Sequence, residues 1–455
     1  MRRGYCSTMK RIAVNDPSEA TAPDRTRSSH RRSVVALGSA AVLVSGAGAA
    51  VVGTAGVAGA DDLTVSTCAD SGAGSLRDAI ATAVASSGAD TITITATCTA
   101  SGPVAVGSPL DVSAGGPLAI VGPGADDFVL DGGGSVRILN VDDIGAFSIS
   151  GVTIRNGQGA LHQSGGAGLS TTGAVSISGV VFTDNVSDAS GGGALNVAYA
   201  SSVSITDSTF AGNDAGIGAG GALYLHYVTG PVTISNSTFA DNVGGNGGAI
   251  RIYSSAGDLE IYNSTFSGNT TLGGGAISTQ FYGNLYLVFS TVADNTSTAD
   301  DVGGLYVDHN AAGVAIAGSI FAGNSGAAPG AYEVDVHVPT GEHHNLFEGP
   351  VSGFTPSVSD VLGLDPLLGP LADNGGPTRT RALGAGSPAI DAGPTAADLA
   401  PAVFPFPGDT ADQRGAPYVR ISGGTSDIGA FEVQPEPTPA PGPEPAPAPE
   451  PTFTG

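Results

Sequence analysis

Polar and aromatic residues recur at two set positions after the Gly-Gly pairs found between residues 192 and 304, and they are the side chains best suited to hold a ligand. Aligned on the glycines, the first position holds Asn196, Tyr224, Arg251 and Ser278, and the second holds Ala198, His226, Tyr253, Gln280 and His309. Aromatic faces combined with hydrogen-bonding tips suit carbohydrates. Six of these residues form a candidate ligand-binding ladder: Tyr224, His226, Arg251, Tyr253, Gln280 and His309. The alternative is an outer face that is merely polar.

Catalysis by this ladder is the weaker interpretation. Glycoside hydrolysis needs two carboxyl groups about 5 to 10 Å apart, and the aligned columns contain none. Asp308 precedes His309, but alternation along a strand sends it inward or into a turn. β-Elimination on an acidic polysaccharide needs a cationic base, and Arg251 is the one obvious cation of the ladder. Arg251 and His309 are therefore the alternative catalytic candidates.

A second group of titratable residues lies close together in sequence near the end of the regular repeats. Its members are Glu333, Asp335, His337, His343 and His344. A solvated loop is the first interpretation, and a metal or catalytic site is the alternative. The chain contains neither an EF-hand loop nor a calcium-binding glycine nonapeptide. We assign no metal site and no cofactor, and calcium stays open because the chain is so acidic.

The ladder belongs to a repeat that organises residues 175–325. Each copy has an alternating strand such as Val232-Thr-Ile-Ser235, then Phe-x-x-Asn, then usually Gly-Gly, and the motif recurs every 26 to 29 residues. Alternation puts apolar side chains on one face of a strand, and a fixed period of this size is typical of stacked coils with a shared core. The pattern predicts an all-β parallel β-helix over residues 101–345, with Phe stacked on Phe and Asn on Asn.

The other repeated residues are interpreted as corners. Gly-Gly supplies a corner that needs either a positive φ or a close backbone approach, and we expect the motif Asn in the left-handed region at the opposite corner. Asp184, Asp241 and Asp294 recur inside the motif and are expected to be turn residues. The repeat therefore specifies architecture, and recognition has to come from residues that vary between copies.

The N-terminal region has a different composition. Residues 1–60 combine several arginines, an Ala/Val/Gly run and a final Ala-Gly-Ala, as in a secretory signal peptide. The alternative for this run is a transmembrane anchor. Residues 61–100 are expected to form an N-terminal cap, in which Ser75 begins a helix over about residues 75–86. Its apolar face would cover the open end of the coils, which otherwise exposes strand edges.

The C-terminal region departs from the repeat after Asn345. Residues 346–433 contain arginines among aspartates, which suggests internal Arg–Asp pairing, and we interpret them as C-terminal coils and a cap. Residues 434–455 are mostly Pro, Glu, Thr and Ala, which predicts a disordered, polyproline-type tail.

The net charge of the chain limits the kinds of partner that it can bind. The leader holds 8 of the 16 Lys and Arg and 3 of the 41 Asp and Glu, so its removal would leave 8 against 38 and a formal charge of −30. Nucleic-acid binding needs clustered cations, and the same charge gives no attraction to an anionic membrane.

Cys68 and Cys98 remain as a pair, and a disulfide between them would stabilise an exported chain by about 3 kcal/mol. The alternative is two unpaired, buried thiols.

Two family resemblances rest on particular segments. The paired Gly-Gly-Ala-Ile/Leu and Phe-x-x-Asn repeats over about residues 150–325 resemble those of chlamydial polymorphic outer-membrane proteins, which implies a right-handed, pectin-lyase-like β-helix. Gly74-Ser-Leu-Arg-Asp-Ala-Ile80 is similar to the Cys-Ser-Leu-Arg-Glu-Ala motif of bacterial surface β-helix proteins, with Gly for Cys and Asp for Glu. Residues 365–432 closely resemble the choice-of-anchor Q family of exported bacterial proteins, for which no reaction is established.

Together these features predict a secreted or cell-surface bacterial protein without enzymatic activity. It would act as an adhesin-like binding protein or a structural spacer, with a polysaccharide, a cell-surface glycan or a protein as partner. We expect a monomer that neither binds nucleic acid nor inserts into a membrane once the leader is removed. The alternative is a polysaccharide lyase or glycoside hydrolase of the same fold.

Overall fold

The computed structural model describes residues 60–435 except 114, 143, 160–164, 188–190, 329, 338–339, 396–397, 399–409 and 423. All described residues belong to one compact unit, Gly56–Gly455. The expected signal peptide, apart from its last residue, and the expected Pro-rich tail after residue 435 lie outside the described residues. Within the described part of the chain, no helix is long and apolar enough to cross a membrane.

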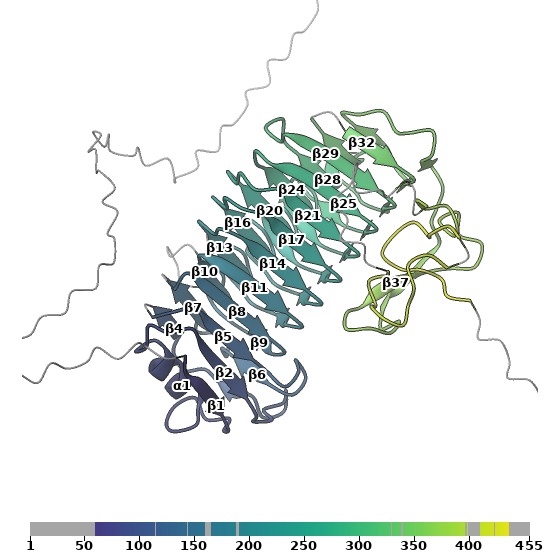
Figure 1. Ribbon diagram of the computed structural model, residues 1–455. Helices are drawn as coiled ribbons and strands as arrows, with labels where there is room; N and C mark the ends of the chain where they lie inside the picture. The colour runs from purple at the N-terminus through teal and green to yellow at the C-terminus, as the bar shows by residue number, and fades with distance from the viewer. Residues whose placement is uncertain are drawn as a thin grey trace, which may run out of the picture. The chain divides into compact units, whose positions relative to one another are not determined.

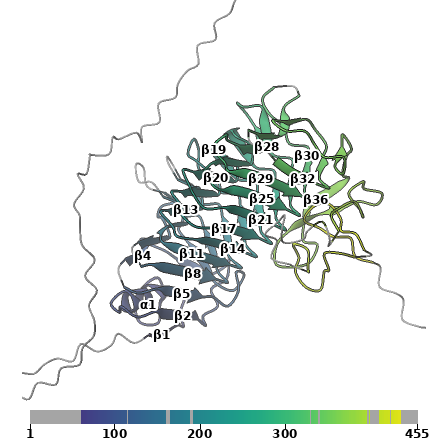
Figure 2. The ribbon, with the colours of Figure 1, turned by 45° about the horizontal axis from the view of Figure 1, so that its top comes forward.

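Three long parallel sheets run side by side along the molecule, and each coil of the chain contributes a strand to sheets 1, 2 and 3 in turn (Figures 1 and 2). Sheet 1 has 11 strands: β1 (Asp62–Val65), β2 (Asp90–Ile94), β5 (Leu118–Val121), β8 (Ala146–Ser150), β11 (Ala174–Ser178), β14 (Val203–Thr206), β17 (Val232–Ser235), β21 (Leu259–Tyr262), β25 (Asn284–Val288), β29 (Gly313–Ala317) and β32 (Thr340–His343).

Sheet 2 also has 11 strands: β3 (Val104–Ala105), β6 (Val129–Asp131), β9 (Thr153–Arg155), β12 (Val181–Thr183), β15 (Thr209–Ala211), β18 (Thr238–Ala240), β22 (Thr265–Ser267), β26 (Thr291–Ala293), β30 (Ile320–Ala322), β33 (Leu346–Phe347) and β35 (Val361–Leu362). Sheet 3 has 10 strands: β4 (Leu110–Ser113), β7 (Leu139–Asp142), β10 (Leu169–Thr172), β13 (Leu195–Ala198), β16 (Leu223–His226), β20 (Ile250–Tyr253), β24 (Ile277–Gln280), β28 (Val302–Val307), β31 (Tyr332–Val336) and β34 (Val351–Ser352).

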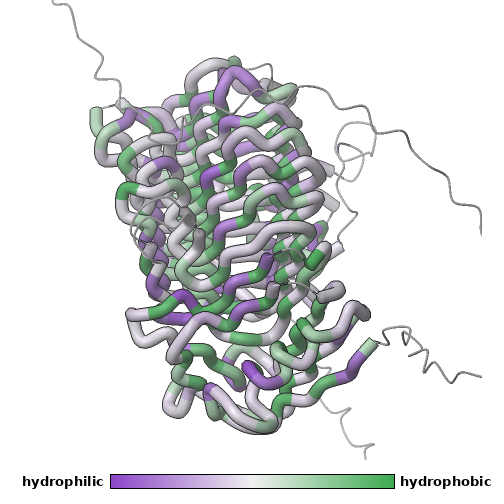
Figure 3. Tube along the Cα trace, turned by 90° about the vertical axis from the view of Figure 1, so that its left-hand side faces the viewer, coloured by the Kyte–Doolittle hydropathy of each residue, from purple (hydrophilic) through white to green (hydrophobic). Residues whose placement is uncertain are grey.

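Two small sheets complete the described strands. One is parallel, with β19 (Val243–Asn246), β23 (Thr270–Gly273) and β27 (Thr296–Ser297), and lies between sheets 2 and 3 along the chain. The other is an antiparallel pair, β36 (Leu368–Ala372) and β37 (Thr380–Leu383). Because the alternating strands each present one apolar face, stacking them encloses a continuous core. Figure 3 shows the stacked coils, with hydrophobic and hydrophilic residues interspersed along each.

The phenylalanines of the repeat stack inside this core, as the spacing predicts. Phe182, Phe210, Phe239 and Phe266 are fully buried. Successive ring centroids lie 4.9, 4.7 and 4.8 Å apart, with nearly parallel planes. These separations match the spacing between neighbouring strands, so the sheet register places the rings directly on one another.

The motif asparagines also stack, but their backbone conformation is not the expected one. The left-handed residue is the one before each Asn, for example Asp184 (φ 54°), Asp241 (φ 54°) and Asp294 (φ 58°). The aspartates are therefore turn residues, as predicted. The asparagines turn inward instead: Asn242 and Asn269 are fully buried, and the Asn242 Nδ2 donates to the Asn269 Oδ1 at 2.9 Å. An inward amide satisfies backbone groups that a corner leaves unpaired, which explains why Asn recurs.

The Gly-Gly corners depend mainly on close approach. A Cβ at Gly220 would lie 2.1 Å from the Leu223 carbonyl oxygen, although Gly220 is not in the left-handed region. Gly247, with φ 93°, needs glycine for both reasons. Close backbone approach and positive φ, the two expected reasons for glycine, therefore both occur at these corners.

The N-terminal cap contains α1 (Leu76–Ala83), at the end of the stack (Figure 1). The Ser75 Oγ accepts from the Asp78 N–H at 3.2 Å, which is the predicted cap. The helix buries Leu76, Ala79, Ile80 and Ala83. It ends earlier than expected, and the residues that follow, Ser86-Ser-Gly88, are poor helix formers. Cys68 and Cys98 form the expected disulfide, with Cα atoms 5.6 Å apart.

The C-terminal region is not the terminal cap that we expected. Residues 346–362 do continue the coils through β33, β34 and β35. The described residues between 365 and 432 instead include contacts with the side of the coils: the Thr378 Oγ1 donates to the Asn236 carbonyl at 2.8 Å, and the Thr265 Oγ1 donates to the Gln413 Oε1 at 2.6 Å. The outer positions of sheet 2 carry threonines here, so this face offers hydrogen bonds that the segment satisfies.

Candidate functional site

The outer side of sheet 3 carries the predicted ladder in two adjacent rows. Strand pairing aligns Tyr224 with Arg251 and Arg251 with Ser278 in the first row. The full first row reads Asp111, Asn140, Ser170, Asn196, Tyr224, Arg251, Ser278, Tyr306, Asp335 and Ser352. The second row contains His226, Tyr253 and Gln280 on neighbouring strands. The structure therefore brings together five of the six predicted residues.

His309 does not occupy the ladder position that the glycine alignment gave it. Tyr306 pairs with Ser278 and Val307 with Thr279, so Asp308 is the residue opposite Gln280. The fifth copy reads Gly303-Gly-Leu-Tyr306 and lacks the alanine found in the other copies, which shifts an alignment made on glycines by one residue. The His309 side chain is 77% exposed, and its Nδ1 lies 2.8 Å from the Asp308 Oδ1.

Arg251 is at the centre of the ladder and is held by neutral groups. Its Nη1 donates to the Ser278 Oγ at 2.7 Å, and its Nη2 donates to the Gln280 Oε1 at 3.0 Å. The guanidinium carbon lies 5.9 Å from the centroid of the Tyr253 ring. Burial lowers the pKa of Arg251, while Tyr224, Tyr306 and Asp308 act in the opposite direction. Among the described residues no carboxylate forms an ion pair with it, although Asp308 lies near enough to favour its charged form.

Aromatic rings lie on the coils that precede Arg251 in the stack. His226 stacks on Tyr224 with centroids 4.7 Å apart, and burial lowers the pKa of His226 to about 4. This imidazole is therefore neutral at pH 7 and contributes a flat, uncharged surface. Tyr199 and Tyr227 stack 5.1 Å apart beside it and are 66% and 41% exposed.

Sequence reasoning missed Tyr199 and Tyr227 because they lie one residue beyond the aligned columns. Both have φ 56°, a left-handed corner that follows directly after the strand. The available signal was the recurrence of Tyr at one coil's spacing. Tyr306 was missed because of the same one-residue shift that misplaced His309.

The register also places carboxylates on this face, where the aligned columns had none. Asp308 begins the turn after β28, as expected, and its Oδ1 accepts from the Asn310 N–H at 3.0 Å. Asp335 is in the first row, with its Oδ2 3.1 Å from the His337 Nε2. Its Oδ1 is buried and has no hydrogen-bond partner among the described residues. Around Arg251 the face therefore combines a cation, several aromatic rings and the carboxylates of Asp308 and Asp335.

The second titratable group does not form one cluster. Asp335 and His337 belong to the face described above, whereas Glu333 is buried in the core, where its Oε2 accepts from the Asn324 Nδ2. His344 is at a left-handed corner with φ 56°. Within the described ranges, no three His, Cys, Asp or Glu side chains come together to hold a metal ion.

Glu333 follows the last of the stacked motif asparagines, because its carboxyl group accepts from Asn324. Its buried environment predicts that the stability of the fold depends on pH. Burial raises the pKa of Glu333 from 4.5 to about 7. The protonated form is therefore favoured by folding, so its contribution is complete below pH 4.5 and is lost as the pH rises towards 7. We expect the free energy of unfolding to fall by about 2 to 3 kcal/mol between pH 5 and pH 8 from this residue. Chemical denaturation of the wild type and Glu333→Gln at both pH values measures it.

The difference between those two proteins isolates Glu333 from other groups that titrate in the same range. Glu333→Gln keeps an acceptor for Asn324 and removes the titration, so its unfolding free energy should change less with pH than that of the wild type. An equal pH dependence in both proteins would contradict the assignment.

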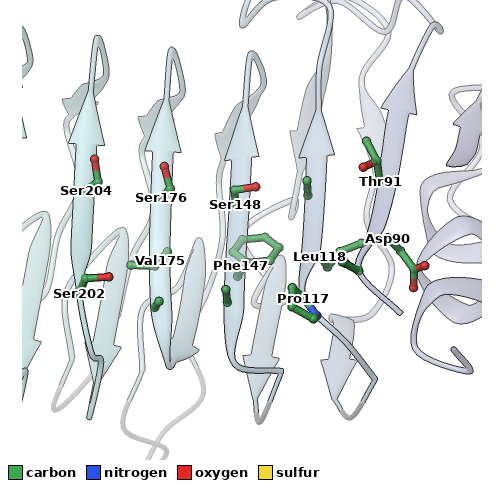
Figure 4. Close-up of a pocket in the computed structure, with 14 residues that line it drawn as sticks. Asp90, Thr91, Pro117, Leu118, Phe147, Ser148, Val175, Ser176, Ser202 and Ser204 are labelled. Carbon is green, nitrogen blue, oxygen red and sulfur yellow. The ribbon is translucent and has the colours of Figure 1, made fainter. Parts of the chain in front are cut away.

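Two shallow hollows lie on the outer faces. One, of about 350 Å³, lies on sheet 1, and Figure 4 shows Ser148, Ser176 and Ser204 side by side on its successive strands. Small hydroxyl groups on a flat strand face offer little to fix a ligand. The other, of about 310 Å³, contains Arg137 and Asn140 beside the first row of sheet 3.

Comparison with known proteins agrees with this geometry. A family model described as a right-handed beta helix region matches residues 131–292. The fold is a right-handed β-helix. The predicted fold class is thereby confirmed, and the match covers the coils that carry Arg251 and most of the ladder. Neither the curated proteins nor the solved structures contain a significant match to this β-helix.

Proposed function

We propose that this β-helix is an exported, non-enzymatic binding protein that holds carbohydrate on the outer side of sheet 3. The observation that carries the proposal is Arg251, a cation held in place by Ser278 and Gln280 rather than by a carboxylate. Tyr224 precedes it in the first row, and Tyr253 lies in the second row. Fixed hydrogen-bond donors between aromatic faces are what sugar rings and their hydroxyl groups require.

The shape of the face supports an extended ligand. Its rows run across successive strands, so equivalent side chains recur about every 4.8 Å along the stack. Tyr199, Tyr227 and Tyr253 carry the aromatic surface across three coils. A polysaccharide or a cell-surface glycan is therefore the proposed partner, with a cell-surface protein as the alternative.

Export, location and oligomeric state are parts of the same proposal. The Ser-Leu-Arg motif, the resemblance of residues 365–432 to the choice-of-anchor Q family and the disulfide all support a secreted or cell-surface protein. The repeats resemble those of adhesin-like polymorphic outer-membrane proteins. A formal charge of −25 opposes both self-association and binding to nucleic acid. We therefore propose a monomer that acts outside the cell.

Hydrolysis of a polysaccharide is the second candidate function. The observation in its favour is that Asp308 and Asp335 share the ladder face with Arg251, because hydrolysis needs a pair of carboxyl groups. Asp308 already accepts hydrogen bonds from Asn310, and Asp335 contacts His337. These contacts give both carboxylates structural roles, so binding without turnover remains the preferred function.

Replacing Arg251 by Ser should weaken glycan binding at least tenfold, because a charged hydrogen bond contributes about 1.5 to 3 kcal/mol. A glycan array selects the ligand, and calorimetric titration of the wild type and variant then gives the two affinities. Arg379→Gln is the matched control, since it removes an exposed positive charge that is not on the face. Arg379→Gln should bind as the wild type does.

The two candidate functions give different results in a second assay. Incubation with neutral and uronic polysaccharides should release no product if the protein only binds. Product release that disappears in Asp335→Asn would establish hydrolysis instead. If the array shows no bound glycan at all, the protein is a structural spacer and the carbohydrate proposal fails.

A further inference from the structure

The hollow beside β4 and β7 has features of a separate binding site. Its volume is about 310 Å³, and its lining includes Pro109, Asp111, Val136, Arg137, Asn140 and Gln158. Asp111 and Asn140 are in the first row of sheet 3. Arg137 lies in the segment that leads into β7, and Gln158 lies in the corresponding segment of the next coil, so two corners and two strands form the hollow.

Arg137 differs from the other arginines of these N-terminal coils. Arg77 pairs with Asp70 at 2.7 Å, and Arg155 pairs with Asp131 at 2.8 Å. Arg137 forms no such ion pair among the described residues. Its Nη1 lies 3.5 Å from the Asn140 Oδ1, at the limit of a hydrogen bond, while its Nε and Nη2 are buried without a partner in the described part of the chain.

The chain at Gly165 passes close to the guanidinium. A Cβ on Gly165 would lie 2.6 Å from the Arg137 Nη2, so the glycine allows the chain to pass close over the side chain. Burial lowers the pKa of Arg137, and Asp142 and Asp111 oppose this effect. A buried donor that lacks an acceptor is unfavourable, because it has lost its hydrogen bonds to water. The site is therefore short of an acceptor that a ligand can supply.

The surrounding groups narrow the chemistry of that ligand. A carboxylate matches the planar fork of a guanidinium. A phosphate would bring a larger negative charge close to Asp111, which lines the same hollow. Hydroxyl groups, in contrast, can donate to the Asp111 carboxylate and to the Asn140 Oδ1. A ring that carries one carboxylate and several hydroxyls can accept from Arg137 and donate to Asp111 and Asn140.

We propose that this hollow is a subsite for a carboxylated sugar, whose carboxylate binds Arg137 and whose hydroxyl groups bind Asp111 and Asn140. The choice of a sugar rests on the proposed function, because the first row leads from Asn140 through Ser170, Asn196 and Tyr224 to Arg251. The choice of a carboxylate does not rest on it. Four strand steps separate Asn140 from Arg251, which is on the order of 19 Å, so the two sites are distinct.

Equilibrium titration of the full chain with sodium D-glucuronate tests the subsite, with D-glucose as the neutral counterpart. We expect saturable binding of glucuronate and much weaker binding of glucose. Arg137→Gln should weaken glucuronate binding at least tenfold, whereas Arg379→Gln, which removes an exposed charge outside the face, should leave it unchanged. Thermal unfolding of each variant confirms that the fold is retained, and ¹⁵N chemical shifts of the Arg137 Nε report contact directly in the wild type.

Several results would overturn the subsite. These are equal affinity of Arg137→Gln and the wild type, equal binding of glucose and glucuronate, or no saturation at tens of millimolar glucuronate. The outcome is separable from that of the proposed function. If the wild type binds no glycan on the array but still binds glucuronate at Arg137, carbohydrate binding by the Arg251 ladder is refuted and the subsite stands.

Discussion

Asn269→Ala is expected to lower the free energy of unfolding by about 4 kcal/mol, because several buried polar groups lose their partners at once. The Asn269 Oδ1 accepts from the backbone N–H and the Nδ2 of Asn242, at 3.0 and 2.9 Å. Its Nδ2 donates to the Phe239 carbonyl at 3.0 Å and to the Asn295 Oδ1 at 2.9 Å. Denaturant unfolding monitored by circular dichroism measures the loss.

Asn246→Ala is the matched control for this substitution. Asn246 is exposed on β19, one coil before Asn269, so its removal should change the unfolding free energy by less than about 0.5 kcal/mol. If the two variants unfold alike, the inner amide ladder is not an important source of stability. Asn269→Leu fills the space left by alanine, and a similarly large loss in that variant would assign the effect to hydrogen bonds rather than to a cavity.

Arg420→Met is expected to release residues 365–432 from the side of the coils while the coils stay folded. Arg420 is fully buried and lies 4.4 Å over the Phe289 ring. Its Nη1 donates to the Gly429 carbonyl and its Nη2 to the Asn263 Oδ1, both at 2.9 Å. Its Nη1 also lies 4.0 Å from the Glu432 Oε2. Removing one partner of a buried charge pair costs about 3 to 5 kcal/mol.

Hydrogen exchange at pH 8 should therefore show lost protection in residues 365–432, with protection retained in sheet 1. Burial raises the pKa of Glu432 to about 7, so at pH 8 this carboxylate is charged and would be left unpaired. Adding Glu432→Gln to Arg420→Met should restore part of the protection. Arg379→Met, at an exposed position, is the control. Equal loss of protection throughout the coils in Arg420→Met would contradict a local role.

Most of the solenoid could be predicted because its information is local and repeated. A strand shows its buried face through alternation, and a coil shows its length through the return of Phe and Asn. Phe182 and Phe210 were predicted to stack and do so. The conformation of the motif Asn was not predicted, since the same residue type suits both a left-handed corner and an inward hydrogen-bonding position.

The candidate face was predicted only in part. Tyr224, Arg251 and Gln280 follow from alternation, which places every second residue outside. His309 was predicted at the ladder position that Asp308 occupies, because the fifth copy lacks one alanine. A shift of one residue along a strand moves a side chain to the other face. The Arg137 hollow depends on contacts between neighbouring coils, and no pattern in the sequence marks it.

By itself, the sequence determined the β-helix, its apolar core and the outward positions of the central ladder, because these depend on periods that adjacent residues reveal. Only the tertiary structure decided which charges are paired. It placed Arg381 against Asp294 of an earlier coil and left Arg251 and Arg137 without an ion pair among the described residues. It also placed Thr378 and Gln413 beside coils more than a hundred positions earlier. Those contacts depend on distances between coils, which a repeat specifies only after it has folded.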